Sequence, residues 1–251
     1  MTAAPVGQLA IALSALLAIT LATLTLARVD VRRDAVVAVA RAAVQLTVVA
    51  LLIGWVFRHP GATALYLALM LGAATWTSMR RIGLGPTSFA PLLLAICAGA
   101  TAAIVPVLAS GALPTRAETV VPFSAQIIGG AMTAASLTGG RLRDDVTAEW
   151  GIVEGWLALG ATPRAAVAVQ ARRAVARSLV PALDQTRNAG IVVLPGAFVG
   201  LLLGGASPAE AAQVQLLVLV GLLAAESVAA VVTASLLAGR VGAKRPGADR
   251  A

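Results

Sequence analysis

The sequence predicts an all-α, polytopic membrane protein with about seven transmembrane helices, its N-terminus outside and its C-terminus in the cytoplasm. Only 12% of the 251 residues are charged and 59% are apolar, whereas roughly a quarter of the residues in a soluble domain are charged. The mean hydropathy is +0.90. Helices of about 20 residues with short connections would use this length in roughly six to eight spans. We therefore expect one transmembrane domain, residues 1–251, in the lipid bilayer.

Seven apolar runs are the expected spans. The first has no Lys or Arg before it and three arginines soon after it, which is the opposite polarity to a cleaved signal peptide. We expect it to be a retained helix with an outside N-terminus. The runs cover about Val6 to Ala27, Ala35 to Phe57, Ala62 to Met79, Phe89 to Ser110, Thr119 to Gly139, Asn188 to Leu203 and Ala211 to Ala238.

Basic residues in the connections follow the same orientation. The outside connections contain only Arg58 and Arg116. Cytoplasmic loops of membrane proteins have an excess of Lys and Arg, so this pattern favours a bacterial plasma-membrane protein and explains the net charge of +8 without nucleic acid. The cytoplasmic set is Arg28, Arg32, Arg33, Arg80, Arg81, Arg141, Arg143, Arg164, Arg172, Arg173, Arg177, Arg187, Arg240, Lys244, Arg245 and Arg250.

The sequence contains no enzyme motif. A P-loop needs a Lys after its second Gly, and the only Lys is Lys244, in the C-terminal tail. His59 and Cys97 are the only residues of their kinds, so a disulfide within the chain, a histidine-based metal cage and a Ser-His-Asp arrangement are all excluded. We expect no catalytic residue and no cofactor in this chain.

The long connection from Gly140 to Arg187 is expected to form a cytoplasmic coupling segment. It is too apolar for a disordered linker, and a short helix within it should stop at Gly160. Such a helix lies along the membrane or docks into a groove of another subunit. The residues assigned to coupling are Glu154, Trp156, Leu157, Leu159, Gly160, Ala161 and Pro163. Asp144 and Asp145, earlier in the segment, are expected to be solvated loop charges.

This segment resembles the coupling loop of ABC-transporter permeases. The wider chain resembles the UPF0014 family, which includes bacterial iron-export permeases and plant aluminium-sensitivity proteins. The matching stretches are Arg41-Ala42-Ala43-Val44-Gln45-Leu46, Ile128-Gly129-Gly130-Ala131-Met132, Ala158-Leu159-Gly160-Ala161-Thr162-Pro163, Arg177-Ser178-Leu179-Val180-Pro181-Ala182-Leu183-Asp184, Gly190-Ile191-Val192-Val193-Leu194-Pro195-Gly196 and Gly204-Gly205-Ala206-Ser207-Pro208.

The resemblance implies a permease that pairs with a separate ABC ATPase, as a dimer of each, and exports a substrate, with ATP and Mg held by the partner. It implies iron as the substrate class. The chain departs from the family pattern at Gly130, where an Asn is expected, and at Ala197 and Phe198, where bacterial members tend to have methionines. These changes remove possible metal ligands and leave the metal site unknown.

Polar residues within the apolar runs are the candidates for a translocation path. Arg41 and Gln45 lie one turn apart on the second run, and Glu226 lies near the middle of the seventh. A lone carboxylate at that depth needs a partner or a proton, so we predict that the second and seventh helices are neighbours and that Arg41 pairs with Glu226. The alternative is that Arg41 extends to the headgroups.

The fifth run is the least lipid-like and contributes Gln126, Met132 and Thr133 to the path. Its small and hydroxyl residues permit close helix packing or line a water-filled path, and both remain open.

Two further functions remain open. A proton-coupled secondary transporter would use Glu226 as its protonation site but leaves the coupling loop unexplained. A membrane scaffold or receptor without transport leaves the polar fifth run unexplained.

Overall fold

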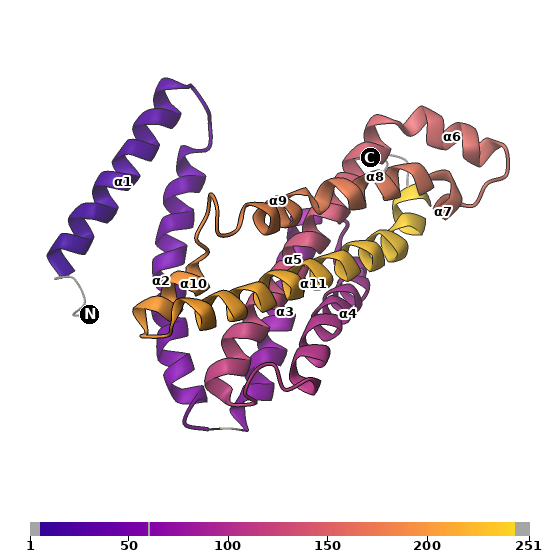
Figure 1. Cartoon of the computed structure of the whole chain (residues 1–251). Coiled ribbons are helices and arrows are strands. Elements are labelled where there is room, and N and C mark those ends of the chain that lie inside the picture. Colours follow the sequence, from indigo (N-terminus) through magenta and orange to yellow (C-terminus); the bar gives the residue numbers. More distant parts are fainter. Residues whose placement is uncertain (1–5, 60, 244–251) are drawn as a thin grey trace. The chain divides into compact units, whose positions relative to one another are not determined.

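The computed structural model describes residues 6–59 and 61–243, which form helices joined by turns (Figure 1). The predicted all-α class is confirmed, since the described residues contain no strand and only one isolated bridge, Ala189 to Val193. Contacts divide the chain into two compact units, Met1–Pro60 and Gly61–Ala251. The predicted cytoplasmic residues Lys244, Arg245 and Arg250 lie outside the described residues.

The first unit is a pair of helices, α1 (Val6–Leu26) and α2 (Arg32–Val56). The turn between them places Arg28 at φ 54°, a left-handed conformation usually taken by Gly. Arg41 and Gln45 lie in α2, on one helix face, as the sequence predicts.

The second unit is built around four long helices. They are α3 (Ala62–Ile82), α4 (Phe89–Ala109), α5 (Ala117–Ala148) and α11 (Pro208–Ala243), with the 3₁₀ turn η1 (Pro86–Ser88) before α4. α11 packs along both α4 and α5, and α3 packs on α5. Small residues allow this close approach, because a Cβ at Gly99 of α4 would lie 2.5 Å from the carbonyl oxygen of Ala225.

Five short helices complete the second unit. They are α6 (Trp150–Ala158), α7 (Pro163–Ala166), α8 (Ala168–Ser178), α9 (Val180–Asn188) and α10 (Gly196–Leu203). α8 packs on α5, while α7, α8, α9 and α10 each contact α11.

Six helices of the described chain are long and apolar enough to cross a membrane. The expected sixth run, Asn188 to Leu203, differs from the sequence prediction because it is not one helix: α9 ends at Asn188, and α10 is only eight residues long. Gly190 at φ 85° turns the chain, and Pro195 lacks the N–H that would continue a helix. An eight-residue helix spans about 12 Å, less than the hydrocarbon core of roughly 30 Å.

The fifth predicted helix is longer than its apolar run. α5 continues to Ala148, so Asp144 and Asp145 are helical rather than loop residues. Asp145 is also not a free solvated charge, because it accepts a hydrogen bond from Arg177 of α8 and its side chain is 17% exposed. The apolar run ends at Gly139, and the helix continues beyond it, where α8 packs on its last turns.

Candidate translocation pocket and coupling segment

A polar pocket of about 290 Å³ lies among α5, α8, α9 and α11. Glu226 of α11 lines it together with Gln126 and Thr133 of α5, so the structure brings together three of the residues that the sequence assigned to the path. The other lining residues are Gly129, Gly130, Leu137, Ser178, Pro181, Ala182, Gln185 and Leu222.

The polar residues of α5 lie on different faces of the helix. Gln126, Gly129, Gly130 and Thr133 recur at intervals of three and four residues and line the pocket. Other polar residues of α5 are buried in helix packing: Ser136 shares a 2.8 Å hydrogen bond with Ser78 of α3, and Thr138 donates a 2.7 Å hydrogen bond to Ser178 of α8.

Glu226 occupies space that Gly130 leaves open. A Cβ at Gly130 would lie 2.9 Å from Oε1 of Glu226 and 2.6 Å from a methyl of Leu222. The carboxylate therefore lies directly against the α5 backbone, on the pocket wall.

Other predicted path residues lie elsewhere. Met132 packs against the hydrophobic core and does not line the pocket. Arg41 and Gln45 belong to the first unit, and the pairing of Arg41 with Glu226 across the two units stays a prediction.

Sequence reasoning missed Gln185 and Ser178, which line the pocket from the segment expected in the cytoplasm. Ser178 appeared only within a stretch that resembles the family. No periodicity pointed to Gln185, because its position depends on α9 folding along α11.

The coupling segment forms the predicted short helix. α6 ends at Ala158, and Gly160 has the left-handed φ of 87°. The N–H of Gly160 donates to the carbonyl of Leu157, and the N–H of Ala161 donates to that of Trp156, both at 3.0 Å, which closes the helix end. Thr162 then begins α7 by accepting a hydrogen bond from the N–H of Ala165, with Pro163 at the first helical position.

α6 buries one side against the core, while Ile152 and Trp156 on another side line an open groove of about 420 Å³ together with α7 and α8. Val153 is fully buried and Leu157 packs against the core. Ile152, Trp156 and Leu159 are 57%, 53% and 81% exposed. An exposed row of large apolar side chains on a short helix is typical of a contact surface for another molecule. Glu154 is also exposed.

Ion pairs join α8 to the end of α5. Arg173 of α8 donates to Oε1 of Glu149 at 2.5 Å, and Nε2 of Gln170 donates to Oε2 at 2.8 Å. The hydrogen bond from Arg173, and after it that from Gln170, lowers the pKa of the Glu149 carboxyl below its ordinary value. The pair Arg177–Asp145 lies one helical turn away, four residues after Arg173 in α8 and four residues before Glu149 at the end of α5.

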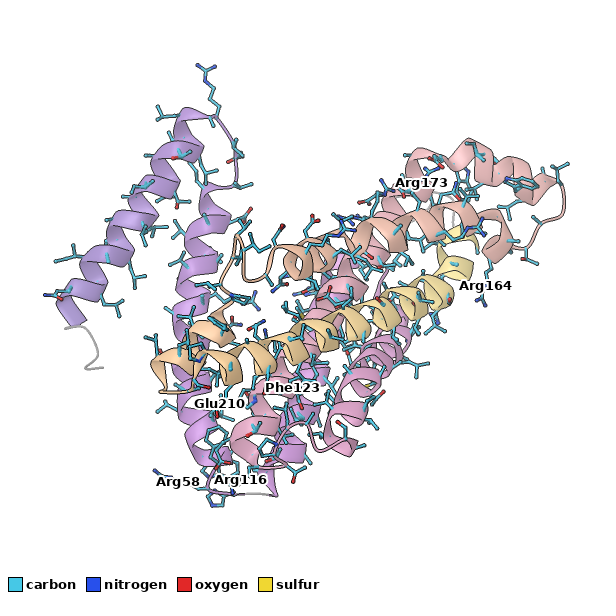
Figure 2. The ribbon with its side chains drawn as sticks, in the orientation of Figure 1. Arg58, Arg116, Phe123, Arg164, Arg173 and Glu210 are labelled. Atoms are coloured by element: carbon cyan, nitrogen blue, oxygen red, sulfur yellow. The ribbon has the colours of Figure 1, made fainter. Side chains whose placement is uncertain are left out.

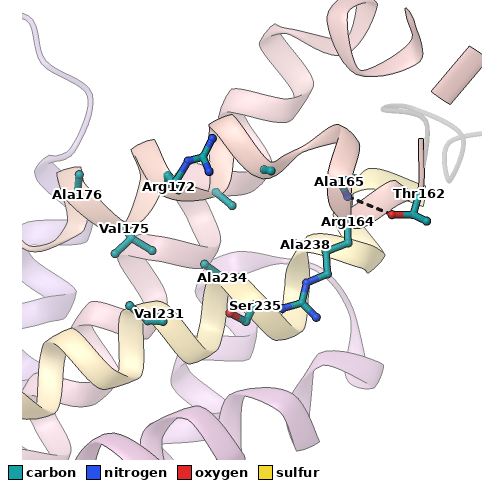
Figure 3. Close-up of a pocket in the computed structure, with 12 residues that line it drawn as sticks. Thr162, Arg164, Ala165, Arg172, Val175, Ala176, Val231, Ala234, Ser235 and Ala238 are labelled. Atoms are coloured by element: carbon teal, nitrogen blue, oxygen red, sulfur yellow. Dashed lines mark hydrogen bonds between the residues drawn. The ribbon is translucent and has the colours of Figure 1, made fainter. Parts of the chain in front are cut away.

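The same segment is joined to α11. Gly242 lies against the Pro163 carbonyl at the start of α7, and Val167 also contacts this position. Figure 3 shows the groove of about 600 Å³ where α7 and α8 lie over α11, lined mainly by Ala and Val with Arg164 and Arg172. α7 and α8 therefore connect this segment to α5 and α11, two of the four helices that line the pocket.

Residues that the sequence places on opposite sides of the membrane lie at opposite ends of the second unit. Figure 2 shows Arg164 and Arg173, expected in the cytoplasm, at one end of the bundle. Arg116, expected outside, lies at the other end.

Residues 6–59 and 61–243 contain no group of three or more His, Cys, Asp or Glu that could hold a metal ion.

The long apolar helices define a polytopic membrane protein. The chain belongs to the family described as "Uncharacterised protein family (UPF0014)", whose model matches residues 6–241. The resemblance stated from the sequence is thereby confirmed.

Three relatives show the breadth of this family. The chain is 34% identical to the UPF0014 membrane protein STAR2 of Oryza sativa subsp. japonica, over 90% of this chain and 80% of the relative. It is 32% identical to protein ALUMINUM SENSITIVE 3 of Arabidopsis thaliana, over 81% and 75%. It is 28% identical to the probable iron export permease protein FetB of Escherichia coli (strain K12), over 83% and 82%. No solved structure matches the chain at a significant level.

Proposed function

We propose that this chain is the non-catalytic permease subunit of an ABC exporter in the bacterial plasma membrane. A separate ATPase subunit would bind ATP and Mg and dock on α6, and two permeases would pair with two ATPases. The observation that carries the proposal is the exposed apolar face of α6, which is followed by α7 and α8, the helices that contact α11 and the end of α5. The relative whose name describes a probable iron export permease supports a metal cation such as iron as the substrate.

The contacts suggest how ATP could act on the pocket. Movement of α6 by a docked ATPase would reach α5 through the Glu149 and Asp145 pairs and α11 through the contact of Pro163 with Gly242. Packed helices transmit such displacements as rigid elements. Because α5 and α11 form the pocket walls, their movement would open it outward.

Capture of the ATPase is the first test. The subunit encoded with this chain would be co-purified with wild type and with Trp156→Ala, and its ATP hydrolysis measured in lipid. Removal of a central aromatic from an interface typically costs about 2 kcal/mol or more, so we expect roughly thirtyfold weaker capture. Trp76→Ala is the matched control, because Trp76 is also 53% exposed but lies on α3.

Two results would contradict the proposal: no ATPase bound by the wild-type chain, or equal loss in both variants. Charge reversal by Glu154→Arg and strain at Gly160, introduced by Gly160→Val, provide further tests at the same surface.

A second candidate is a proton-coupled secondary transporter, favoured by the position of Glu226 in an intramembrane polar pocket. It requires transport without any ATPase, driven by a proton gradient and abolished by Glu226→Gln. Transport that depends on ATP and stops in Trp156→Ala would exclude it.

A further inference from the structure

The pocket beside Glu226 is lined by oxygen-bearing side chains that have few partners of their own. Within described residues 61–243, no hydrogen bond or ion pair joins Glu226, Gln126 or Gln185 to another side chain. Thr133 donates its hydroxyl proton to the carbonyl of Gly129 and Ser178 donates to that of Val175, which leaves only oxygen lone pairs on these two hydroxyls. The half-buried carboxylate of Glu226 and the exposed amides of Gln126 and Gln185 are available to a ligand.

Neighbouring residues restrict the position of the Glu226 carboxylate. Gly130 leaves room for it, and Leu222 packs at the same place from α11, one turn before Glu226. A carboxylate held between a helix backbone and a packed side chain has little freedom to reach the headgroups. This distinguishes Glu226 from a charged residue that extends to the membrane surface.

The chemistry of these groups points to a cation of a particular kind. Carboxylate and amide oxygens suit hard cations, whereas soft metals prefer thiolate, thioether or imidazole ligands, and none of those lines the pocket. A single carboxylate with neutral amides holds a divalent ion weakly and leaves positions for water. Weak binding is what a transport path requires, because the ion must also leave.

We propose that this pocket binds one hard divalent cation that keeps part of its hydration shell. Glu226 supplies the negative charge, and Gln126 and Gln185 supply amide oxygens from the facing helices. The proposal rests on the proposed function in treating this cation as the transported species, but binding itself requires no ATPase.

The test uses Mn²⁺ as the probe and the purified chain alone in lipid nanodiscs. Free Mn²⁺ gives an electron paramagnetic resonance signal that disappears on binding, so titration yields an affinity. We expect saturable binding, displaced by excess Mg²⁺, and at least about tenfold weaker binding in Glu226→Gln, in line with the effect of losing a group that supports a metal ligand. Glu210→Gln is the matched control, since Glu210 lies on the same helix and hydrogen-bonds Ser207 outside the pocket.

Two further variants keep the result interpretable if Glu226→Gln fails to fold. Gly130→Ala places a methyl group 2.9 Å from the carboxylate and should weaken binding without removing the charge. The double variant Gly130→Asp, Glu226→Ala moves the carboxylate from α11 to α5 and should restore part of the lost Mn²⁺ affinity.

Equal Mn²⁺ binding by wild type and Glu226→Gln would overturn the proposal. The absence of saturable Mn²⁺ binding by wild type would also overturn it, and this is the result expected if Arg41 pairs with Glu226 and neutralises its charge. Binding that Mg²⁺ does not displace would overturn the assignment to hard cations. Failure of ATPase capture with Mn²⁺ binding intact would instead contradict the proposed function alone.

Discussion

The carbonyl oxygen of Pro163 lies against the α-carbon of Gly242, where any larger residue would place its Cβ into the backbone of α7. This contact joins the start of α7, directly after the exposed end of α6, to the last turn of α11. Sixteen residues separate Gly242 from Glu226 along α11, or about 24 Å at 1.5 Å per residue. A single continuous helix thus extends from the coupling segment to the pocket.

Gly242→Val should separate α7 from α11. The inserted side chain meets backbone atoms, which cannot rotate away, so we expect a loss of about 1 to 3 kcal/mol in unfolding free energy and reduced ATPase capture. Thermal unfolding in detergent and the capture assay measure the two effects. Gly239→Val is the control, because no atom lies within 4 Å of a Cβ there. Equal effects at both glycines would show that this contact is unimportant.

The sequence predicted the long helices well, because a continuous apolar run identifies each helix and the Arg residues in the connections indicate its expected orientation. It failed at 188–203, where the apolar composition suits a span but Gly190 and Pro195 stop the helix from within. Such breaks are difficult to recognise in a membrane protein, because neighbouring helices can supply the missing backbone partners. Here Gln215 of α11 accepts a hydrogen bond from the N–H of Phe198 at 3.2 Å.

Part of the pocket could likewise be predicted. Glu226, Gln126 and Thr133 are noticeable as polar residues at membrane depth. Gly130 carries no such signal, because its role depends on the distance between α5 and α11. Gln185 was assigned to the cytoplasm by its neighbours Arg177 and Arg187, and only the packing of α9 along α11 brings it to the pocket.

The crossing of α4 and α11 provides a test of helix packing. Gly99→Ala would place a methyl carbon 2.5 Å from the carbonyl oxygen of Ala225, so the helices must separate. We expect a loss of about 1 to 3 kcal/mol in unfolding free energy. In Gly72→Ala, where a Cβ meets no atom within 4 Å, the better helix former should instead stabilise α3 by roughly 0.5 to 1 kcal/mol. Thermal unfolding in detergent distinguishes the two, and a neutral Gly99→Ala would contradict the close crossing.

The Glu149 cluster should make stability depend on pH. Since the folded state lowers the pKa of this carboxyl, its contribution is present above the ordinary pKa of an unfolded glutamate and is lost as the pH falls through the folded-state pKa. The melting temperature of Glu149→Gln should therefore lie below that of wild type at neutral pH and approach it in acid. Glu154→Gln, which changes an exposed carboxylate on α6, is the control, and its melting temperature should change with pH as that of wild type does. A constant difference between Glu149→Gln and wild type at every pH would argue against the ionised pair.

The segment from α9 to α10 should cross the membrane as a broken element. Seven crossings place the Arg-rich connections and the Arg240 end of α11 on one side, whereas six would place Arg240 on the other side. α9 and α10 are each too short to span alone and are joined by a turn in which Ala189 bridges Val193, and Gln215 satisfies one backbone N–H at the start of α10. A groove of about 360 Å³ lies between this irregular backbone, at Ala189, Gly190, Leu194 and Pro195, and α11.

Cysteine labelling in intact cells measures this crossing directly. In a Cys97→Ala background, an impermeant maleimide should label Ala209→Cys from outside, as it labels the reference Thr115→Cys in the outside connection before α5. Arg187→Cys should react only after permeabilisation, as the cytoplasmic reference Thr147→Cys does. Labelling of positions 187 and 209 from the same side would mean that the segment returns to the surface it left. The chain would then have six crossings, with both of its ends on one side of the membrane.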